Sequence, residues 1–244
     1  MEGLQRLKEL RKAVFKVKIS GVITSKTLNK LNKDLKKETW RQPVALALVV
    51  NSPGGSAAQS SLLRQRLMAY STQHKVPIYT FAEDIAASGG YYVMLAGEEL
   101  YVSQPSLVGS IGARLNFVGL KDLAAKYGIE RRSWSTSPLA LEERLDPLRD
   151  LSPEAEKWVK SMLEQTHNEF KEVVEESRGG KLRGKTEELF SGDVFTAERA
   201  LEMGLVDKLG ECDQVMKEMF PEYKIVELSK ESWLSQMRSK YIGS

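Results

Sequence analysis

One serine and two glycine loops have the types and spacing to build a serine nucleophile with an oxyanion hole. Ser88 lies in the segment 86–92, AASGGYY, and an earlier loop over 51–55 reads NSPGG. Glycines let another stretch of backbone approach closely. Bare N–H groups beside a serine can stabilise the negative oxygen that forms when the hydroxyl attacks a carbonyl. The candidate donors are the N–H of Gly54 or Gly55 and the N–H of Gly89.

Alternating strands and helices must bring these loops together. The run 44–50, VALALVV, is apolar throughout, which is typical of a parallel strand buried on both faces. Repeats of strand, Gly-rich loop and helix predict α/β layers with both loops at the carboxyl edge of the sheet, where ligands bind. Strands are predicted at 13–24, 43–50, 77–82, 99–103, 130–135 and 224–228, and helices at 25–37, 57–71, 88–96, 118–127, 152–177 and 196–203.

Length and composition predict one soluble domain. The chain has 244 residues, of which 41% are apolar, enough for one sizeable core. No low-complexity linker interrupts it, so we expect a single domain over 1–244, with 1–12 and 231–244 as peripheral extensions. The sequence shows no apolar run long enough to span a bilayer and no signal-peptide core near its start. It does not encode the cellular compartment.

Charge and residue counts argue against several other classes. The net charge is only +3, from 36 basic and 33 acidic residues, which disfavours a dedicated nucleic-acid binder. The single cysteine, Cys212, excludes an intrachain disulfide framework and is expected to be a packing residue. His74 and His167 are isolated, so neither is expected to bind zinc. The sequence predicts no metal site and no cofactor.

Four separated segments resemble the signal peptide peptidase A family of serine peptidases. Together they cover roughly residues 16–215 in the family's order. The resemblance implies a Clp protease/crotonase-like fold, which is a single α/β domain of repeated β-β-α units in a superhelix with C-terminal helices. It also implies cleavage of peptides or unfolded proteins in or near membranes, including signal-peptide remnants, by a closed homo-oligomer. The segments are 51–55, 82–92, 108–112 and 192–210.

The same resemblance assigns roles to individual residues. Ser88 matches the nucleophile of a serine–lysine dyad, and Ser110 matches the serine that orients the lysine base. Gly54, Gly55, Gly89 and Gly109 match the oxyanion and substrate-binding loops. The position of the lysine itself is occupied by Ala140, whose methyl group cannot accept a proton.

Other basic side chains near this position are poor substitutes. Arg144 and Arg149 stay protonated, and no motif supports Lys121 or Lys126. Three explanations for Ala140 remain: a lysine changed to trap an inactive enzyme, a natural pseudoenzyme, or a base supplied from elsewhere, such as a neighbouring subunit. The retention of both serines in a matching frame favours the first, so the chain as given is expected to be inactive.

Competing functions make different demands on the sequence. A Ser-His-Asp triad of the Clp type needs a histidine soon after residue 112, and none occurs there. A crotonase-like acyl-CoA enzyme would use acidic groups, for which Glu83 and Asp84 are candidates. A peptide-binding scaffold would keep the glycine loops as strand-pairing edges and need no base. In the simplest non-catalytic interpretation, Ser88 only caps a helix.

Overall fold

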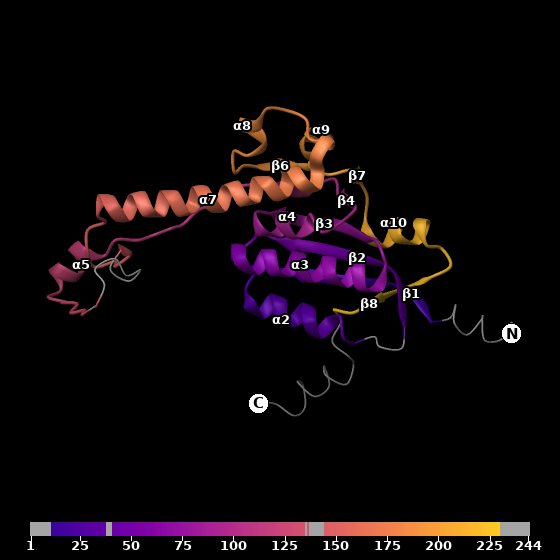
Figure 1. Cartoon of the computed structure of the whole chain (residues 1–244), viewed down its shortest axis with the longest axis horizontal. Helices are drawn as coiled ribbons and strands as arrows, with labels where there is room; N and C mark the ends of the chain where they lie inside the picture. Colours follow the sequence, from indigo (N-terminus) through magenta and orange to yellow (C-terminus); the bar gives the residue numbers. More distant parts are fainter. Residues whose placement is uncertain (1–10, 38–40, 135, 137–143, 230–244) are drawn as a thin grey trace, which may run out of the picture. The chain divides into compact units, whose positions relative to one another are not determined.

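The computed structural model describes residues 11–37, 41–134, 136 and 144–229. The chain divides into two compact units, one formed by 1–112 together with 170–244 and the other by 113–169 (Figure 1). The single domain expected over 1–244 stays a prediction. Each unit is described by itself below.

The first unit contains an eight-stranded sheet among the described residues. Its order is β6-β5-β3-β2-β1-β8, and β4 pairs with both β3 and β7. Every neighbouring pair is parallel except β5 and β6, which are antiparallel. The strands are β1 (Lys12–Ser20), β2 (Gln42–Ser52), β3 (Ile78–Ala87), β4 (Glu99–Val102), β5 (Leu107–Gly109), β6 (Val194–Thr196), β7 (Lys208–Leu209) and β8 (Lys224–Glu227).

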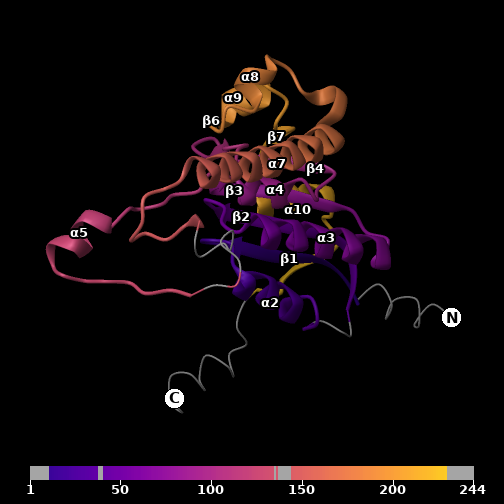
Figure 2. The same ribbon diagram turned by 60° about the vertical axis from the view of Figure 1, so that its left-hand side comes forward.

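Helices cover both faces of this sheet (Figure 2). One face packs against α2 (Ser25–Asp34), α3 (Ala57–His74), α4 (Gly89–Met94) and the last turns of α7 (Pro153–Arg178). The other face packs against α10 (Cys212–Met219). The remaining elements are α8 (Thr186–Leu189), α9 (Ala197–Glu202) and a short 3-10 helix (Gly179–Lys181).

The apolar run in β2 is buried on both faces, as its sequence predicts. Leu46, Leu48 and Val50 belong to the core under α2, α3 and α4. Ala45 and Val49 belong to the core under α10, because successive side chains in a strand point to opposite faces. Small alanines alternate with large leucines here, so the two faces receive side chains of different size. The central parallel strand is therefore confirmed.

The second unit contains α5 (Lys121–Lys126) and the first turns of α7. Helix α7 begins as its sequence predicts, because the Ser152 hydroxyl accepts a hydrogen bond from the Ala155 N–H at 3.1 Å. The strand predicted at 130–135 is wrong over its described residues, 130–134, which form no strand. An apolar side chain such as Trp134, which is 88% exposed, does not make a strand without a neighbour to pair with.

Candidate active site

Ser88 stands at the turn between β3 and α4 in a strained backbone conformation. Its φ is 51° and its ψ is −123°, a region that costs energy for any residue with a side chain. Although Ser88 occupies the N-cap position of α4, its side chain makes no capping hydrogen bond. The helix-cap interpretation therefore fails, because the Ser88 hydroxyl does not bond the first turn of α4.

A neighbouring strand places Ser110 beside Ser88. The Ser88 N–H donates to the Gly109 carbonyl at 2.8 Å, and Ala87 pairs with Gly109 in the parallel register of β3 and β5. The two serines follow equivalent positions of adjacent strands, which lie about 4.8 Å apart. Ser110 also has a positive φ, 52°, and its N–H donates to the Asp193 carbonyl at 2.6 Å. The structure thus brings together the two serines that the sequence selected.

Gly54 lies directly against the nucleophile candidate. A Cβ atom built on Gly54 would come within 2.8 Å of both the Ser88 Cβ and the Gly89 nitrogen. Its φ of 100° also disfavours any side chain. The Gly54 N–H donates to the Ser52 hydroxyl at 3.1 Å, and that hydroxyl donates to the Gly21 carbonyl at 2.7 Å. This chain of bonds fixes the loop and occupies the Gly54 N–H.

The Gly55 N–H takes no part in the hydrogen bonds that join Gly54, Ser52 and Gly21. The Ile23 N–H donates to the Gly54 carbonyl at 2.8 Å, and the Ser56 N–H donates to the Ile23 carbonyl at 3.0 Å. This bridge uses the groups on either side of Gly55, so the Gly55 N–H points away from Ile23. The Gly89 N–H, in the first turn of α4, has no acceptor within the helix. Of the predicted donors, Gly55 and Gly89 are the pair that this geometry favours.

Two buried serines pack against the glycines of α4, and neither of them was identified from the sequence as part of the site. A Cβ on Gly89 would lie 2.3 Å from the Ser60 Oγ, and one on Gly90 would lie 2.6 Å from the Ser52 carbonyl oxygen. Ser60 and Ser52 are both fully buried. The two glycines therefore allow α4 to pack closely against the end of β2 and the first turn of α3, on either side of the first glycine loop.

A hydrogen bond from Tyr91 ties α4 to the segment after α9, where a buried ion pair lies. The Tyr91 hydroxyl donates to the Leu205 carbonyl at 2.7 Å. Close by in the chain, the Arg178 guanidinium donates to the Gly204 carbonyl at 2.9 Å and to both carboxylate oxygens of Asp207, at 2.8 and 3.0 Å. The Arg178 side chain is only 1% exposed. Sequence reasoning missed this pair, although Asp207 lies inside the segment 192–210 that carries the family resemblance.

The pKa of Asp207 reflects this anchoring. Burial alone would raise it, but hydrogen bonds from Arg178, Lys181 and the Leu100 N–H lower the pKa to about 2, from an ordinary value of 3.8. A carboxyl whose pKa is lower in the folded state stabilises the fold above the unfolded pKa, and this contribution disappears as the pH falls.

Replacing Asp207 with asparagine will therefore destabilise the protein in a pH-dependent way. At pH 6 we expect Asp207→Asn to lower the free energy of unfolding by about 3 kcal/mol, because it leaves the buried Arg178 charge unpaired. The difference from the unmodified chain will narrow between pH 4 and pH 2, measured by urea unfolding. Asp213→Asn, which removes an exposed ion pair with Lys16, serves as the control and should cost under about 1 kcal/mol. If the difference in unfolding free energy between Asp207→Asn and the unmodified chain does not change with pH, this role for Asp207 is wrong.

The general base is the part of the site that the structure does not place. Ala140 lies outside the described residues. In the second unit, Lys121 pairs with Asp150, and this hydrogen bond raises the pKa of Lys121, which keeps it protonated. Arg144 lies over the Trp158 ring with its Cζ 4.8 Å from the centroid. None of these described groups replaces a neutral lysine.

The acidic candidates for a crotonase-like reaction are engaged elsewhere. Glu83 and Asp84 lie in a bulge of β3, between Ala82, which pairs with Val50, and Ala86, which pairs with Ser52. Glu83 forms an ion pair with Lys18, and Asp84 accepts a hydrogen bond from the Asn51 side chain at 2.6 Å. Both carboxylates thus have polar partners of their own.

The described residues also bear on three other features: a reactive thiol, a metal site and a membrane-spanning helix. Cys212 packs in the core under α10, and burial raises the pKa of its thiol to about 12. In the described part of the chain, acidic, histidine and cysteine side chains form no group of three or more that could hold a metal ion. No helix within the described ranges is both long and apolar enough to cross a membrane.

Comparisons with known proteins agree with this architecture. The family model described as Peptidase family S49 matches residues 71–225. A putative protease of Synechocystis, slr0021, is 30% identical over 82% of this chain and 70% of its own length. The Na(+)/H(+) antiporter NhaA of Brucella abortus is 36% identical to this chain. The match covers 72% of this chain but only 24% of the antiporter's length.

A solved structure shares the fold. A mutant of the membrane-bound stomatin-specific protease 1510-N, in complex with a substrate peptide, superimposes with a TM-score of 0.56. The match covers 94% of this chain and 97% of that one at 16% sequence identity. This likeness confirms the predicted Clp protease/crotonase-like α/β fold.

Proposed function

The chain belongs to peptidase family S49, and from this membership we propose that it is a serine endopeptidase of the signal peptide peptidase A type whose nucleophile is Ser88. The observation that carries the proposal is the conformation of Ser88. Its strained backbone is held between Gly54 and Gly109, and its hydroxyl does not cap the helix that it precedes. Strain of this kind is typical of functional positions.

The proposed reaction is acyl transfer through Ser88. Its Oγ attacks the carbonyl carbon of the scissile peptide bond while its proton passes to a lysine amine at position 140. The N–H groups of Gly55 and Gly89 stabilise the resulting oxyanion. The lysine then gives the proton to the leaving amine as the C–N bond breaks, and water hydrolyses the acyl-enzyme with the same amine as base. Ser110 orients the amine and does not attack.

With Ala140 in place of the lysine, the serine proton has no acceptor. The oxyanion donors and the nucleophile remain, so binding of a peptide and slow residual turnover are expected. This chain is then an inactivated form of a peptidase. We propose that its substrates are extended peptides or unfolded segments with small or apolar residues near the cleaved bond, presented close to a membrane.

A serine-reactive fluorophosphonate tests the assignment of the nucleophile and its base together. In the chain as given, labelling should be slow; in Ala140→Lys it should be at least about a hundredfold faster, because the base raises the reactivity of the hydroxyl. Peptide mapping should place the label on Ser88. Equal labelling rates in the two proteins would argue against a lysine at position 140, and a label on another serine would exclude Ser88 as the nucleophile.

We also propose that the chain assembles into a closed cyclic homo-oligomer. The support comes from the second unit, where Val118, Tyr127 and Trp134 are 69%, 70% and 88% exposed, more apolar surface than a monomer usually leaves in water. The sequence also predicts exposed apolar side chains at Trp158, Trp233, Leu234 and Met237. Trp158 of α7 is half-buried, and the other three lie outside the described residues. Light scattering coupled to size exclusion should give a mass several times 27.4 kDa. A monomeric mass at tens of micromolar protein would contradict assembly.

A further inference from the structure

The outer edge of β1 extends beyond its neighbour. β8 pairs only with Ala13–Lys16, whereas β1 continues to Ser20. The Leu228 N–H still donates to the Lys16 carbonyl at 2.8 Å, but the next outward group, the Lys18 N–H, donates to the Ser229 side chain at 2.7 Å. A side-chain oxygen thus stands where a strand would supply a carbonyl.

Two further backbone groups continue this open edge. Residues of a parallel strand bond alternately to their two neighbours. The Gly21 N–H donates to the Asn51 carbonyl on the β2 side at 2.9 Å. By this alternation, the backbone N–H and C=O groups of Lys18 and Ser20 point away from β2, toward the open edge. Within the described ranges, the Lys18 carbonyl and the Ser20 N–H have no strand to pair with. An unpaired edge of this kind is a template for adding another strand.

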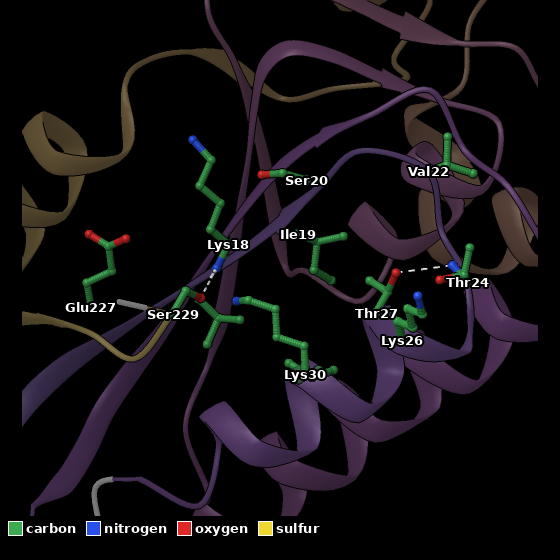
Figure 3. Close-up of a pocket in the computed structure, with 12 residues that line it drawn as sticks. Lys18, Ile19, Ser20, Val22, Thr24, Lys26, Thr27, Lys30, Glu227 and Ser229 are labelled. Atoms are coloured by element: carbon green, nitrogen blue, oxygen red, sulfur yellow. Dashed lines mark hydrogen bonds between the residues drawn. The ribbon is translucent and has the colours of Figure 1, made fainter. Parts of the chain in front are cut away.

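A cavity of about 400 Å³ lies along this edge, between β1 and α2 (Figure 3). Its apolar lining includes the buried residues Val17, Ile19 and Leu31. Hydroxyl groups and charged side chains make up the rest. The full lining is Val17, Lys18, Ile19, Ser20, Val22, Thr24, Lys26, Thr27, Lys30, Leu31, Glu227 and Ser229.

Charged side chains line the cavity, and some of them are already paired. Three lysines line it, against one carboxylate, that of Glu227. Lys18 pairs with Glu83, and Lys30 pairs with Asp34 at 2.8 Å. Lys26 is exposed in the first turn of α2, and the described part of the chain gives it no ion-pair partner. An incoming anionic group therefore meets at least one uncompensated ammonium.

We propose that this edge is a second peptide-binding site, which takes an extended, mainly apolar segment with an acidic residue near one end as an added strand beside β1. The backbone of the segment pairs with Lys18 and Ser20, and the side chains on its α2 face fill the cavity, with the acidic residue of that face beside Lys26. β1 and β2 lie between this edge and β3, which leads to Ser88, although the segment after β1 also bonds the first glycine loop through Ile23 and Gly54. The proposal does not rest on the peptidase activity.

A fluorescein-labelled heptapeptide, Thr-Val-Thr-Val-Thr-Glu-Thr, carries its valines and its glutamate on one face and is the probe that tests this site on the full chain. Fluorescence anisotropy should show saturable binding that weakens as salt is added, because the contacts are partly ionic. Two N-methylated versions of the probe distinguish strand addition from other binding. One carries N-methyl groups on the odd-numbered amides and the other on the even-numbered amides. Only the version whose blocked amides face β1 should lose affinity; equal affinities of the two versions would exclude strand pairing.

Charge reversals on α2 provide a matched pair of variants. Lys26→Glu should weaken probe binding by at least about fivefold, the effect of roughly 1 kcal/mol. Lys33→Glu makes the same change on the same helix, but Lys33 does not line the cavity, so its effect should stay below about twofold. Equal effects of the two variants would overturn the proposed role of the lysines.

Hydrogen–deuterium exchange locates the bound probe. Protection should appear in peptides covering 17–31 and not in those covering 51–60 or 86–92. Protection confined to the segments around Ser88 would overturn the proposal. So would a lack of binding, since lysines at a sheet edge can also serve simply to discourage aggregation. Edge amides that are already as protected as the centre of β1 without the probe would mean that the chain itself covers the edge.

Discussion

Ala140→Lys will increase the rate of peptide hydrolysis by at least about a thousandfold. Losing one member of a cooperating catalytic unit removes most of its effect, so returning the base restores it to a site whose other parts are in place. Those parts are the strained Ser88, the adjacent Ser110 and the glycine loops. The measurement is kcat/KM on short fluorogenic peptides with small or apolar residues at the cleaved bond.

The rate of the Ala140→Lys protein should also rise with pH. A lysine base acts only when neutral, and a lysine that works as a base near neutral pH needs a pKa below the usual value of about 10.4. Ala140→Arg is the matched control, because it adds similar bulk and charge but stays protonated. It should leave the rate within about threefold of the unmodified chain. A gain of less than about tenfold for Ala140→Lys would show that the base belongs at another position.

Ser88→Ala, introduced into the Ala140→Lys protein, will abolish that gain. Without the hydroxyl no acyl-enzyme can form, and only the oxyanion donors and peptide binding remain. We expect a loss of about a thousandfold or more in kcat with little change in KM, and complete loss of fluorophosphonate labelling. The alanine fits the space of the serine, so the fold of the site should be retained.

Two further serine variants calibrate this result. Ser110→Ala should reduce kcat but leave part of the labelling, because Ser110 positions the base and does not attack. Ser25→Ala, at an exposed residue in the first turn of α2, should change neither. If turnover persists at more than about a tenth of its value after Ser88→Ala, another group is the nucleophile.

These experiments also separate the peptidase from a peptide-binding pseudoenzyme. A scaffold adapted only to bind would not need Ser88 in a strained conformation, and restoring a lysine would gain nothing. The acyl-CoA alternative has less support, because Glu83 and Asp84 are held by Lys18 and Asn51.

The sequence predicted the parts of this protein that local patterns encode. The apolar run before NSPGG identified the central strand, and the small residues around Ser88 identified a tight turn between a strand and a helix. Glycines in a turn need no partner to be recognised, because their use depends on local backbone freedom. The position of the glycine loops at one edge of a parallel sheet followed from the order of the elements.

Long-range contacts decided the rest. The three-residue strands β5 and β6 are too short for a periodic pattern, and only the pairing of β5 with β3 and of β6 with β5 makes them strands. That pairing puts Ser110 beside Ser88. Conversely, 130–134 has an apolar and polar pattern but no partner strand. Backbone hydrogen bonds between strands depend on the neighbour and not on the residue's own propensity.

The same reason explains which site groups the sequence could not reveal. Gly54 and Gly55 are equivalent in the sequence, and only the bonds to Ser52 and Ile23 show that the Gly54 N–H is occupied while that of Gly55 points away. The Arg178–Asp207 pair joins residues 29 positions apart, next to the Leu205 carbonyl that accepts the Tyr91 hydrogen bond. The sequence by itself determined which residues could do the chemistry, because residue type and local turn geometry are local properties. Tertiary structure alone decided how the backbone around them is held, because the hydrogen bonds that hold it come from partners distant in the chain.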